Sequence, residues 1–316
     1  MTIPDQGPDT GAPEAPASTR AGFVALLGAP NAGKSSLLNR LVGTKVSIVS
    51  PKVQTTRRRV IGIAISGEAQ LVFVDTPGIF EPHESRRLER AMVQAAWAGA
   101  AEADLVVAVV DARKGLDGDT MRVLDGIAKA STPAILAINK IDLVDAPKLL
   151  PLIKAANEHV PFVETFLVSA LEGNGVPDLL ADIGQRLPAE PWLFPEDQLS
   201  DLSSRALAAE LTREQIFLKL NQELPYSITV ETEAWNENPE TGEVRIDQTI
   251  YVQRDSQKAI VLGKGGRQIK AIGEAARKEI ERNLECRVHL FLFVKVRERW
   301  TEDPERYREL GLDFNS

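Results

Sequence analysis

The sequence predicts an α/β domain with a doubly wound, mostly parallel sheet, followed by a smaller α+β domain. A glycine-rich loop at residues 28–35 lies between an apolar strand and an amphipathic helix, and strands then alternate with helices as far as residue 187. Three prolines between residues 188 and 195 break that alternation. Beyond them, two strands alternate apolar and polar residues, as half-buried strands do, and a second glycine-rich turn opens a helix. A chain of 316 residues is long enough for both domains.

The composition is that of a globular protein, with 43% hydrophobic and 26% charged residues. No apolar run is long enough to span a bilayer, and the first residues lack the basic and apolar regions of a secretory signal. Cys286 is the single cysteine, which excludes an internal disulfide and suits a reducing cytoplasm. The net charge of −8 argues against nonspecific coating of nucleic acid, and the three histidines are too scattered to form a metal cluster. Residues 1–20 are rich in Pro, Gly, Ala and acidic residues, so we expect a disordered tail.

The first glycine-rich loop matches G-x-x-x-x-G-K-[ST] at every fixed position. Glycines let backbone N–H groups surround phosphate oxygens, and the N-terminus of the following helix adds partial positive charge. Lys34 would reach the β- and γ-phosphates, and the Ser35 hydroxyl would ligate Mg²⁺. A glycine turn followed by a chance Lys-Ser pair is the alternative, and the flanking strand and helix argue against it. The residues expected to contact the nucleotide here are Gly28, Ala29, Pro30, Asn31, Ala32, Gly33, Lys34, Ser35 and Ser36.

Two later segments suit the γ-phosphate and the metal ion. A sensor of the γ-phosphate needs a hydroxyl on a mobile loop, which Thr55 or Thr56 supplies; the sequence does not distinguish them, and we favour Thr56. An apolar strand then ends at Asp75, where a carboxylate can hold Mg²⁺, and the N–H of Gly78 can bond the γ-phosphate. The expected metal ligands are Ser35, Thr56 and Asp75. The residues of these two segments assigned to the nucleotide site are Thr55, Thr56, Asp75, Thr76, Pro77, Gly78 and Ile79.

Around those residues, the pattern predicts a short strand at 45–49 and a strand pair at 60–65 and 70–74. Residues 51–59 include three consecutive arginines, and we expect an exposed loop whose arginines form a solvated face.

The strand at residues 134–138 ends in a sequence suited to guanine. Asp142 can accept hydrogen bonds from N1–H and from the exocyclic amine, donors that adenine lacks at that edge. The stem of Lys140 can cover the base, while Asn139 holds the loop together and bonds the base. A polar turn after a strand is the alternative. The residues assigned to this part of the site, including a later loop that offers backbone N–H groups to O6, are Asn139, Lys140, Ile141, Asp142, Ser169, Ala170 and Leu171.

In order and spacing, these motifs resemble those of the translation-factor-class small GTPases, and Asn31 together with residues 54–57 resembles the bacterial Era subgroup. The resemblance implies a P-loop NTPase fold for residues 21–187, GTP and GDP as ligands, Mg²⁺ as cofactor and hydrolysis of GTP. The catalytic residues that it implies are Lys34, Asn31, Thr56 and Gly78. It also implies that Asn31 helps to bind K⁺ beside the phosphates. Ile79 stands where Ras-like enzymes place a water-orienting Gln, so fast intrinsic hydrolysis is not expected.

Residues 188–201 form the expected linker and resemble the Era linker, and residues 202–316 form the second domain, with a core at about 220–300. A helix is predicted at 202–224, with strands at 226–232, 243–252 and 288–294. Gly263-x-x-Gly266 separates two helices. The order α-β-β-α-α-β resembles a type II KH domain.

In such a domain the glycines let a sugar–phosphate backbone approach, and basic side chains supply charge. Residues 254–299 contain twelve basic and six acidic residues, a local excess in an acidic protein. Apolar residues, among them Ile272, would line a groove for unstacked bases if the core does not use them. The residues assigned to RNA binding are Ile260, Val261, Gly263, Lys264, Gly265, Gly266, Arg267, Ile269 and Lys270.

The Era resemblance covers nearly all of residues 21–316. It implies binding near the 3′ end of 16S rRNA, a role in assembly of the small ribosomal subunit, and peripheral association with the inner membrane, which nothing else in the sequence indicates. We expect a cytoplasmic monomer that does not bind DNA, whose domains reorient about residues 188–195 after hydrolysis. One alternative is a GTP-dependent docking module whose second domain binds a protein or membrane. Another is a tRNA-modifying GTPase, for which no second cysteine or cofactor motif is present.

Overall fold

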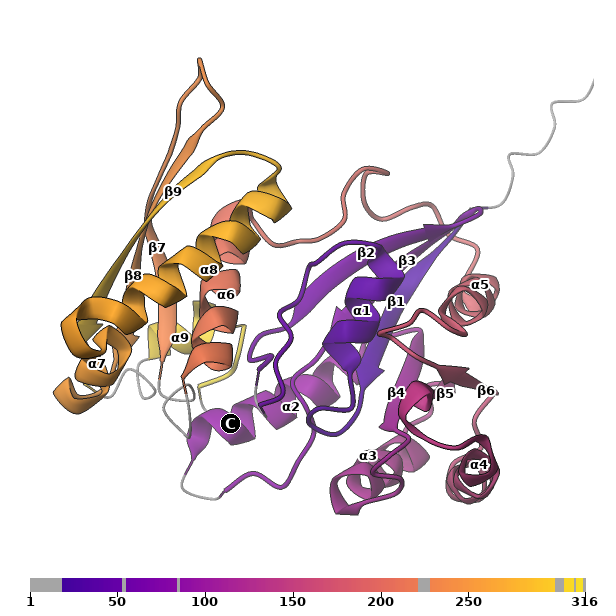
Figure 1. The fold of residues 1–316 in the computed structure, drawn as a ribbon. Coiled ribbons are helices and arrows are strands. Elements are labelled where there is room, and N and C mark those ends of the chain that lie inside the picture. Colours follow the sequence, from indigo (N-terminus) through magenta and orange to yellow (C-terminus); the bar gives the residue numbers. More distant parts are fainter. Residues whose placement is uncertain are drawn as a thin grey trace, which may run out of the picture.

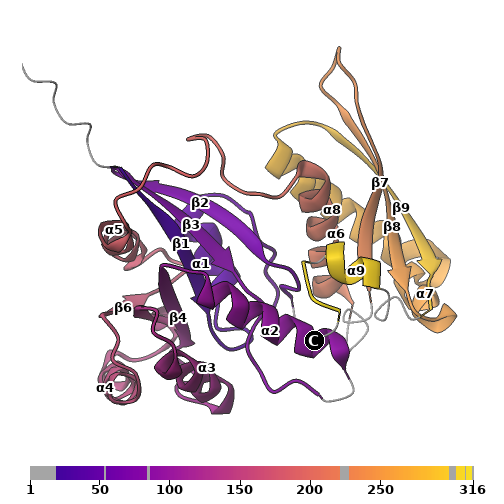
Figure 2. The ribbon, with the colours of Figure 1, turned by 180° about the vertical axis from the view of Figure 1, so that it is seen from behind.

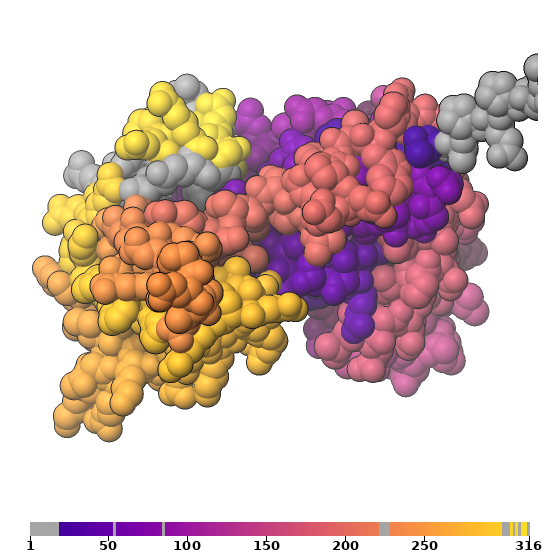
Figure 3. Space-filling view, turned by 90° about the horizontal axis from the view of Figure 1, so that it is seen from above, coloured from indigo at the N-terminus to yellow at the C-terminus, as the bar shows by residue number. Residues whose placement is uncertain are grey.

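The computed structural model describes residues 19–52, 55–83, 86–220, 228–298, 304–309 and 311–314. It contains the two predicted domains side by side, joined by a segment that crosses between them (Figures 1 and 3). The predicted disordered tail lies outside the described residues, apart from Thr19 and Arg20. No helix in the described part of the chain is both long enough and apolar enough to cross a bilayer.

The first domain is built on a six-stranded sheet with the order β2-β3-β1-β4-β5-β6. Only β2 runs antiparallel to its neighbour, so the doubly wound, mostly parallel sheet is confirmed. Every residue of β3 and β4 is buried, as the apolar runs in the sequence predicted. The strands are β1 (Arg20–Leu27), β2 (Val60–Ser66), β3 (Ala69–Asp75), β4 (Leu105–Asp111), β5 (Ala134–Asn139) and β6 (Glu164–Val168).

Helices cover both faces of this sheet. Helices α1 (Lys34–Val42) and α5 (Val176–Arg186) pack their leucines and isoleucine on one face, in a cluster with β1 and β3. Helices α2 (Arg87–Ala101), α3 (Gly118–Lys129) and α4 (Leu149–His159) pack on the other. The 3₁₀ helices η1 (Ile141–Leu143) and η2 (Ala146–Lys148) follow β5. The carboxyl ends of the parallel strands therefore meet at one edge, where ligands bind in such folds.

The second domain has the predicted order of elements. Its sheet has the order β7-β8-β9, with β7 and β8 antiparallel and β8 and β9 parallel. Helices α6 and α8 pack on one face of it. The elements are α6 (Ser204–Lys219), β7 (Thr229–Glu237), β8 (Val244–Val252), α7 (Asp255–Leu262), η4 (Lys264–Gly266), α8 (Arg267–Leu284), β9 (Val288–Val296) and α9 (Pro304–Glu309). Helix α6 ends at Lys219, before the predicted residue 224, and residues 221–227 lie outside the described chain.

The C-terminal segment was not predicted. Tyr307 of α9 is buried in a cluster with Met92 of α2, so the end of the chain returns to the first domain (Figure 2). The guanidinium of Arg87 lies 4.3 Å from the ring centroid of Phe314 and adds to this contact.

The predicted strand at residues 45–49 is wrong. Its backbone is bonded to side chains and not to a neighbouring strand: Asn39 Oδ1 accepts from the N–H groups of Val46 and Ser47, each at 2.9 Å. Further along, the N–H of Val49 donates to Glu214 Oε1 at 2.8 Å. Within the described residues, no strand pairs with this segment.

The expectation of a solvated arginine face is also wrong for Arg57, whose exposed fraction is 2%. Its Nη1 donates to the carbonyl of Ile228 in the second domain at 2.8 Å. Thr55 and Thr56 are buried as well, and residues 53–54 of this loop lie outside the described chain. The end of the loop is thus part of the contact between the domains.

Candidate nucleotide and RNA sites

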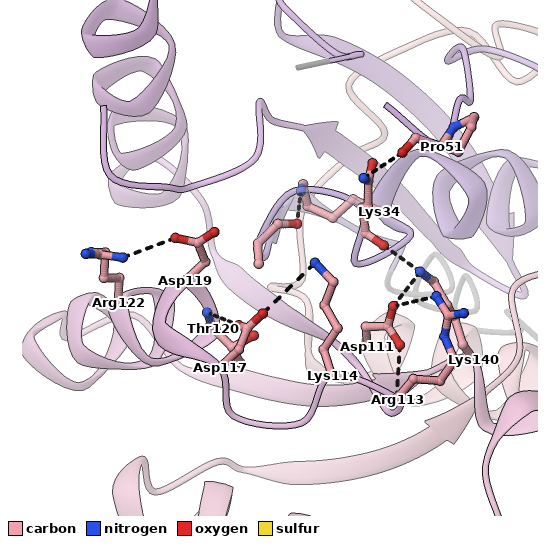
Figure 4. Close-up of polar contacts among 12 residues, drawn as sticks. Lys34, Pro51, Asp111, Arg113, Lys114, Asp117, Asp119, Thr120, Arg122 and Lys140 are labelled. Atoms are coloured by element: carbon pink, nitrogen blue, oxygen red, sulfur yellow. Dashed lines mark hydrogen bonds and ion pairs between the residues drawn. The ribbon is translucent and has the colours of Figure 1, made fainter. Parts of the chain in front are cut away.

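The phosphate-loop residues wrap around the amine of Lys34. Its Nζ donates to the carbonyls of Gly28 at 3.0 Å and Ala29 at 3.2 Å, and the side chain is buried (Figure 4). Burial lowers the pKa of Lys34 to about 8, although the negative charge of Asp75 opposes that shift. Gly33 has φ of 98°, and a Cβ there would lie 2.2 Å from Asn139 Nδ2, so the turn requires glycine.

Behind the loop, hydroxyl groups gather around the buried carboxylate of Asp75. Ser35 Oγ donates to Asp75 Oδ2 at 2.6 Å, and Ser35 Oγ and Thr56 Oγ1 lie 2.9 Å apart. Asp75 Oδ1 has no hydrogen-bond partner among the described residues, and burial raises the pKa of this carboxyl group. An unpartnered carboxylate oxygen beside two hydroxyls is a set of hard oxygen donors that fits Mg²⁺.

The structure distinguishes the two threonines that the sequence left open. Thr55 Oγ1 bonds Ser50 Oγ at 2.6 Å and the carbonyl of Lys52 at 2.7 Å, away from Asp75. Only the hydroxyl of Thr56 is beside Ser35. Ser47, which sequence reasoning missed, also donates to Asp75 Oδ2 at 2.8 Å. Nothing in the sequence around Ser47 indicated this role, because residues 45–49 were interpreted as a strand.

The segment after β3 packs against the phosphate loop. A Cβ at Gly78 would lie 2.9 Å from Pro30 Cα, and the N–H of Ile79 donates to the carbonyl of Gly28 at 3.1 Å. The side chain of Ile79 is buried in the core with Leu27 and Ala96, so it does not support the assignment of Ile79 to the nucleotide site, which stays a prediction. Thr76 is likewise internal, because its hydroxyl donates to the carbonyl of Leu26. One pocket brings together nine of the assigned residues, and Gly28, Ala29, Ala32, Asp75 and Pro77 do not line it. The nine are Pro30, Asn31, Gly33, Lys34, Ser35, Ser36, Thr55, Thr56 and Gly78.

Asn139 ties three loops together, as its sequence context predicted. Its Nδ2 donates to the carbonyl of Ala32 at 3.0 Å, while its Oδ1 accepts from the N–H groups of Lys140 at 2.8 Å and Ala170 at 3.0 Å. The N–H of Ala170 is therefore engaged by Asn139 in this structure. Asp142 Oδ1 accepts from Ser169 Oγ at 2.6 Å, which brings these two assigned residues into contact.

Lys140 lies across the phosphate loop. Its Nζ donates to the carbonyl of Asn31 at 2.5 Å and to Asp111 Oδ2 at 2.6 Å (Figure 4). Burial alone would raise the pKa of Asp111, but hydrogen bonds from Lys140 and Arg113 hold it below its usual value. Arg40, another residue that the sequence did not single out, donates to the carbonyls of Ala170 and Leu171 and supports the loop that contains them.

At the other end of the molecule, the second glycine turn joins α7 to α8. Gly263, Gly265 and Gly266 have φ angles of 69°, 62° and 75°, and a Cβ at Gly265 or Gly266 would meet no atom within 4 Å. The turn therefore offers open backbone at the N-terminus of an 18-residue helix.

Free positive charge concentrates at this turn. Lys264, Arg267 and Lys270 are exposed, and none forms an ion pair with another residue that the structure describes. Further along α8, by contrast, Arg277 and Lys278 each pair with a glutamate on the same helix. The basic excess seen in the sequence is thus neutralised along the helix but not at its N-terminus.

The apolar residues assigned to RNA divide into two groups. Val261 and Ile272 are fully buried in the core of the domain, so Val261 cannot contact a base and its assignment is wrong. Ile260 is 54% exposed, and Ile269 is half-buried beside the turn. These two side chains form the apolar surface that remains beside Lys264 and Arg267.

Comparisons with known proteins match both domains. The family described as "50S ribosome-binding GTPase" matches residues 23–140, and the KH domain family matches residues 223–301. The chain is similar to "GTPase Era" of Sinorhizobium medicae, with 59% identity over 310 residues that cover 98% of each chain. It is 61% identical to "GTPase Era" of Mesorhizobium japonicum over 301 residues, which cover 95% of this chain and 96% of the relative.

Two solved structures resemble the whole fold. A crystal structure of a variant of Aquifex aeolicus Era bound to GDP and AlF4⁻ superposes with a TM-score of 0.87 at 41% identity, covering 93% of this chain and 99% of that one. A crystal structure of Era in complex with MgGDPNP and nucleotides 1506–1542 of 16S ribosomal RNA superposes with the same TM-score, identity and coverage.

Proposed function

This chain belongs to the Era family of GTPases, and from that premise we propose that it couples hydrolysis of GTP to binding of the 3′ end of 16S rRNA during assembly of the small ribosomal subunit. The observation that carries the coupling is the pair of glycine turns, one in each domain, in which left-handed Gly33 and Gly266 precede the N-termini of α1 and α8. Both present backbone and a lysine to phosphate. The relative solved with MgGDPNP and a 16S rRNA fragment supports the same pairing of ligands.

In the first site, each residue has a distinct task. Lys34 exchanges its bonds to the carbonyls of Gly28 and Ala29 for phosphate oxygens. Ser35, Thr56 and Asp75 would hold Mg²⁺, which when bound neutralises charge on the β- and γ-phosphates. The N–H of Gly78 bonds the γ-phosphate, and Asp142 selects guanine. GTP and GDP with Mg²⁺ are therefore the proposed ligands.

The attacking water needs an orienting group other than Ile79, whose side chain is in the core. Asn31 is the proposed contributor through a bound cation, as the family resemblance implies. It lies in the phosphate loop with φ of 63°, and its Nδ2 donates to the carbonyl of Pro51 at 2.9 Å. The amide oxygen of Asn31 and nearby loop carbonyls are the ligand type that K⁺ requires, so we include K⁺ as an activating ion.

In the second site, Gly263 to Gly266 let the RNA backbone approach α8, and Lys264, Arg267 and Lys270 neutralise its phosphates. Ile260 and Ile269 contact unstacked bases. The open backbone at Gly265 and Gly266, next to these cations, favours RNA over the docking of a protein or membrane, because it lets a sugar–phosphate chain approach closely. The family resemblance extends the proposal to a cytoplasmic monomer that associates peripherally with the inner membrane and does not bind DNA.

The test is crosslinking of the full-length protein to total cellular RNA, with either GDPNP or GDP present, followed by sequencing. We expect reads from the 3′ end of 16S rRNA to be enriched in the GDPNP sample. Equal recovery of unrelated RNAs in both samples would contradict the proposed RNA target and its nucleotide dependence.

A further inference from the structure

Helix α6 of the second domain reaches the GTP site of the first. Between α1 and β2, the described residues 45–52 and 55–57 form what we call the switch segment, in which the Thr56 hydroxyl lies beside Ser35 and Asp75. Helix α6 lies on the side of the second domain that faces the first (Figures 1 and 2). Ile48, near the middle of the switch segment, packs into the second domain's own core with Ala208 and Leu211 of α6.

Arg213 of α6 holds the end of the switch segment. Its exposed fraction is 3%, and its Nη2 donates to the carbonyl of Thr55 at 2.7 Å. The guanidinium is fixed from two other directions: Nε donates to Glu210 Oε1 at 3.1 Å, and the Phe217 ring centroid lies 5.3 Å from Cζ. A rigid donor thus grips the peptide immediately before Thr56.

Glu214, the next residue of α6, holds the start of the switch segment. Its Oε2 accepts from Lys45 Nζ at 2.6 Å, and its Oε1 accepts from the N–H of Val49 at 2.8 Å. The Glu214 side chain is 4% exposed, and Lys45 also lies 3.6 Å from Glu279 Oε2 of α8. Both ends of the switch segment are therefore bound to helices of the second domain.

We propose that Arg213 and Glu214 are positioning residues for GTP hydrolysis, which hold the switch segment so that Thr56 faces Ser35 and Asp75. The RNA-binding domain then completes the GTP site. This inference rests on the proposed role of Thr56 as a metal ligand. Arg213 and Glu214 are buried charges, and burying a charge costs free energy unless it is paired. Buried charge pairs add little stability, but they favour one arrangement of the two domains over others.

The position of Thr56 should affect binding of GTP but not of GDP. Only in the triphosphate state does this threonine contribute to the metal site. Contact between α6 and the switch segment consequently favours GTP over GDP. By linkage, GTP favours the same contact between the domains to the same extent. The two domains thereby communicate through two side chains of one helix.

The experiment uses two variants of the full-length protein, Arg213→Met and Lys45→Met. The second variant removes the ion-pair partner of Glu214 by changing Lys45, which is the more exposed residue of that pair. We expect each variant to need a roughly tenfold higher Mg²⁺ concentration to retain fluorescent GDPNP, since a hydrogen bond to a charged group is lost. Affinity for GDP should stay unchanged. Amide hydrogen exchange of residues 45–57, measured without nucleotide, should become faster.

Three further variants serve as controls for the Mg²⁺ requirement. Arg205→Met removes an arginine of the same helix whose guanidinium donates to the carbonyls of Thr232 and Glu233, and it should behave like the wild type. Arg213→Lys keeps a hydrogen-bond donor at this position. It should therefore need less Mg²⁺ to retain GDPNP than Arg213→Met, but more than the wild type. Thr56→Ala should raise the Mg²⁺ requirement at least as much as Arg213→Met.

An unchanged Mg²⁺ requirement in both Arg213→Met and Lys45→Met, with Thr56→Ala impaired, would overturn this inference alone. An equal loss of GDP and GDPNP binding would also overturn it, as that result indicates general destabilisation. An unimpaired Thr56→Ala would instead contradict the proposed metal site. If Arg213→Met does not fold, Lys45→Met decides.

Discussion

Gln70 of β3 grips Phe194 of the linker with both atoms of its side-chain amide: Nε2 donates to the Phe194 carbonyl at 2.8 Å, and Oε1 accepts from the Phe194 N–H at 2.9 Å. Gln70 is fully buried, and its Oε1 also accepts from the N–H of Leu193 at 2.8 Å. Further along, the N–H of Ile63 in β2 donates to the carbonyl of Leu199 at 2.9 Å. The linker is therefore bound to the sheet.

These hydrogen bonds bear on where the two domains can turn relative to each other. Residues 188–195 were expected to be the hinge, but the bonds from Gln70 and β2 hold residues 193–200 to the first domain. A reorientation that keeps these bonds has to turn at residues 202–203, between the linker and α6. A hinge there moves α6 directly against the switch segment.

Replacing Gln70 with Leu should free the linker. The change leaves the backbone groups of Leu193 and Phe194 without their partner, so we expect the free energy of unfolding to fall by about 3 kcal/mol. Urea denaturation measures this loss, and limited proteolysis should show faster cleavage at residues 190–198. Gln198→Leu is the control, because the Gln198 amide donates within the linker to Ser200. Equal protease resistance of Gln70→Leu and wild type would show that the grip is unimportant.

Ile79→Gln should not restore a Ras-like catalytic residue. The Ile79 side chain lies in the core, so a glutamine there would bury its amide and not orient water. We expect no acceleration of GTP hydrolysis and a fall of about 1–3 kcal/mol in the free energy of unfolding. Single-turnover hydrolysis and thermal denaturation measure the two effects. A faster rate would mean that the side chain can turn out of the core toward the phosphates.

Nucleotide binding should take up a proton above pH 8. The pKa of Lys34 is lowered to about 8, so its amine is mostly neutral at higher pH in the empty site. Phosphate favours the ammonium form, so affinity should fall as the pH rises from about 8 toward the usual lysine value of about 10.4. We expect the proton uptake per GDP to be larger at pH 8.5 than at pH 6.5, where the amine is already charged in the empty site.

Calorimetry of GDP binding in buffers with different ionisation enthalpies measures this uptake. Lys34→Met is the control, since it removes the titrating amine but keeps a side chain of similar length. Uptake that persists in Lys34→Met would assign the proton to another group, for which the buried Asp75 is the nearest candidate.

Gly263→Asp combined with Gly266→Asp should abolish RNA binding and spare GTP hydrolysis. The two carboxylates would repel the RNA backbone at the turn, and a side chain at either position is strained by its positive φ. Filter binding to a 16S 3′-end RNA and a phosphate-release assay separate the two activities. Gly242→Asp changes a glycine with φ of 69° in the turn between β7 and β8, and it should retain RNA affinity. Retained affinity in the double variant would contradict the placement of the RNA.

The site predictions that rest on a complete motif are local in the sequence. Residues 28–35, 139–142 and 263–266 each carry their chemistry within one turn, so spacing alone identifies them. The parts that were missed join distant segments: Ser47 bonds Asp75, and Arg213 bonds the carbonyl of Thr55 from 158 residues away. A local sequence pattern cannot predict such a contact, because each of these residues is of an ordinary type for a loop or a helix surface. Arg57 illustrates the same point, since its partner carbonyl lies 171 residues further along.

Asp142→Asn should change the base that the protein selects. The Asp142 carboxylate has its Oδ1 2.6 Å from Ser169 Oγ, and it is the group that we expect to accept hydrogen bonds from guanine N1–H and the exocyclic amine. An amide there places a donor against those donors, so we expect GTP affinity to fall by roughly a hundredfold. Xanthosine triphosphate, which has an acceptor in place of the amine, should gain affinity. Asp145→Asn is the matched control, because Asp145 is exposed three residues further along and pairs with Lys148. Competition of both nucleotides against fluorescent GDP gives the selectivity, and an Asp142→Asn protein that still prefers GTP as strongly as Asp145→Asn would remove Asp142 from the guanine site.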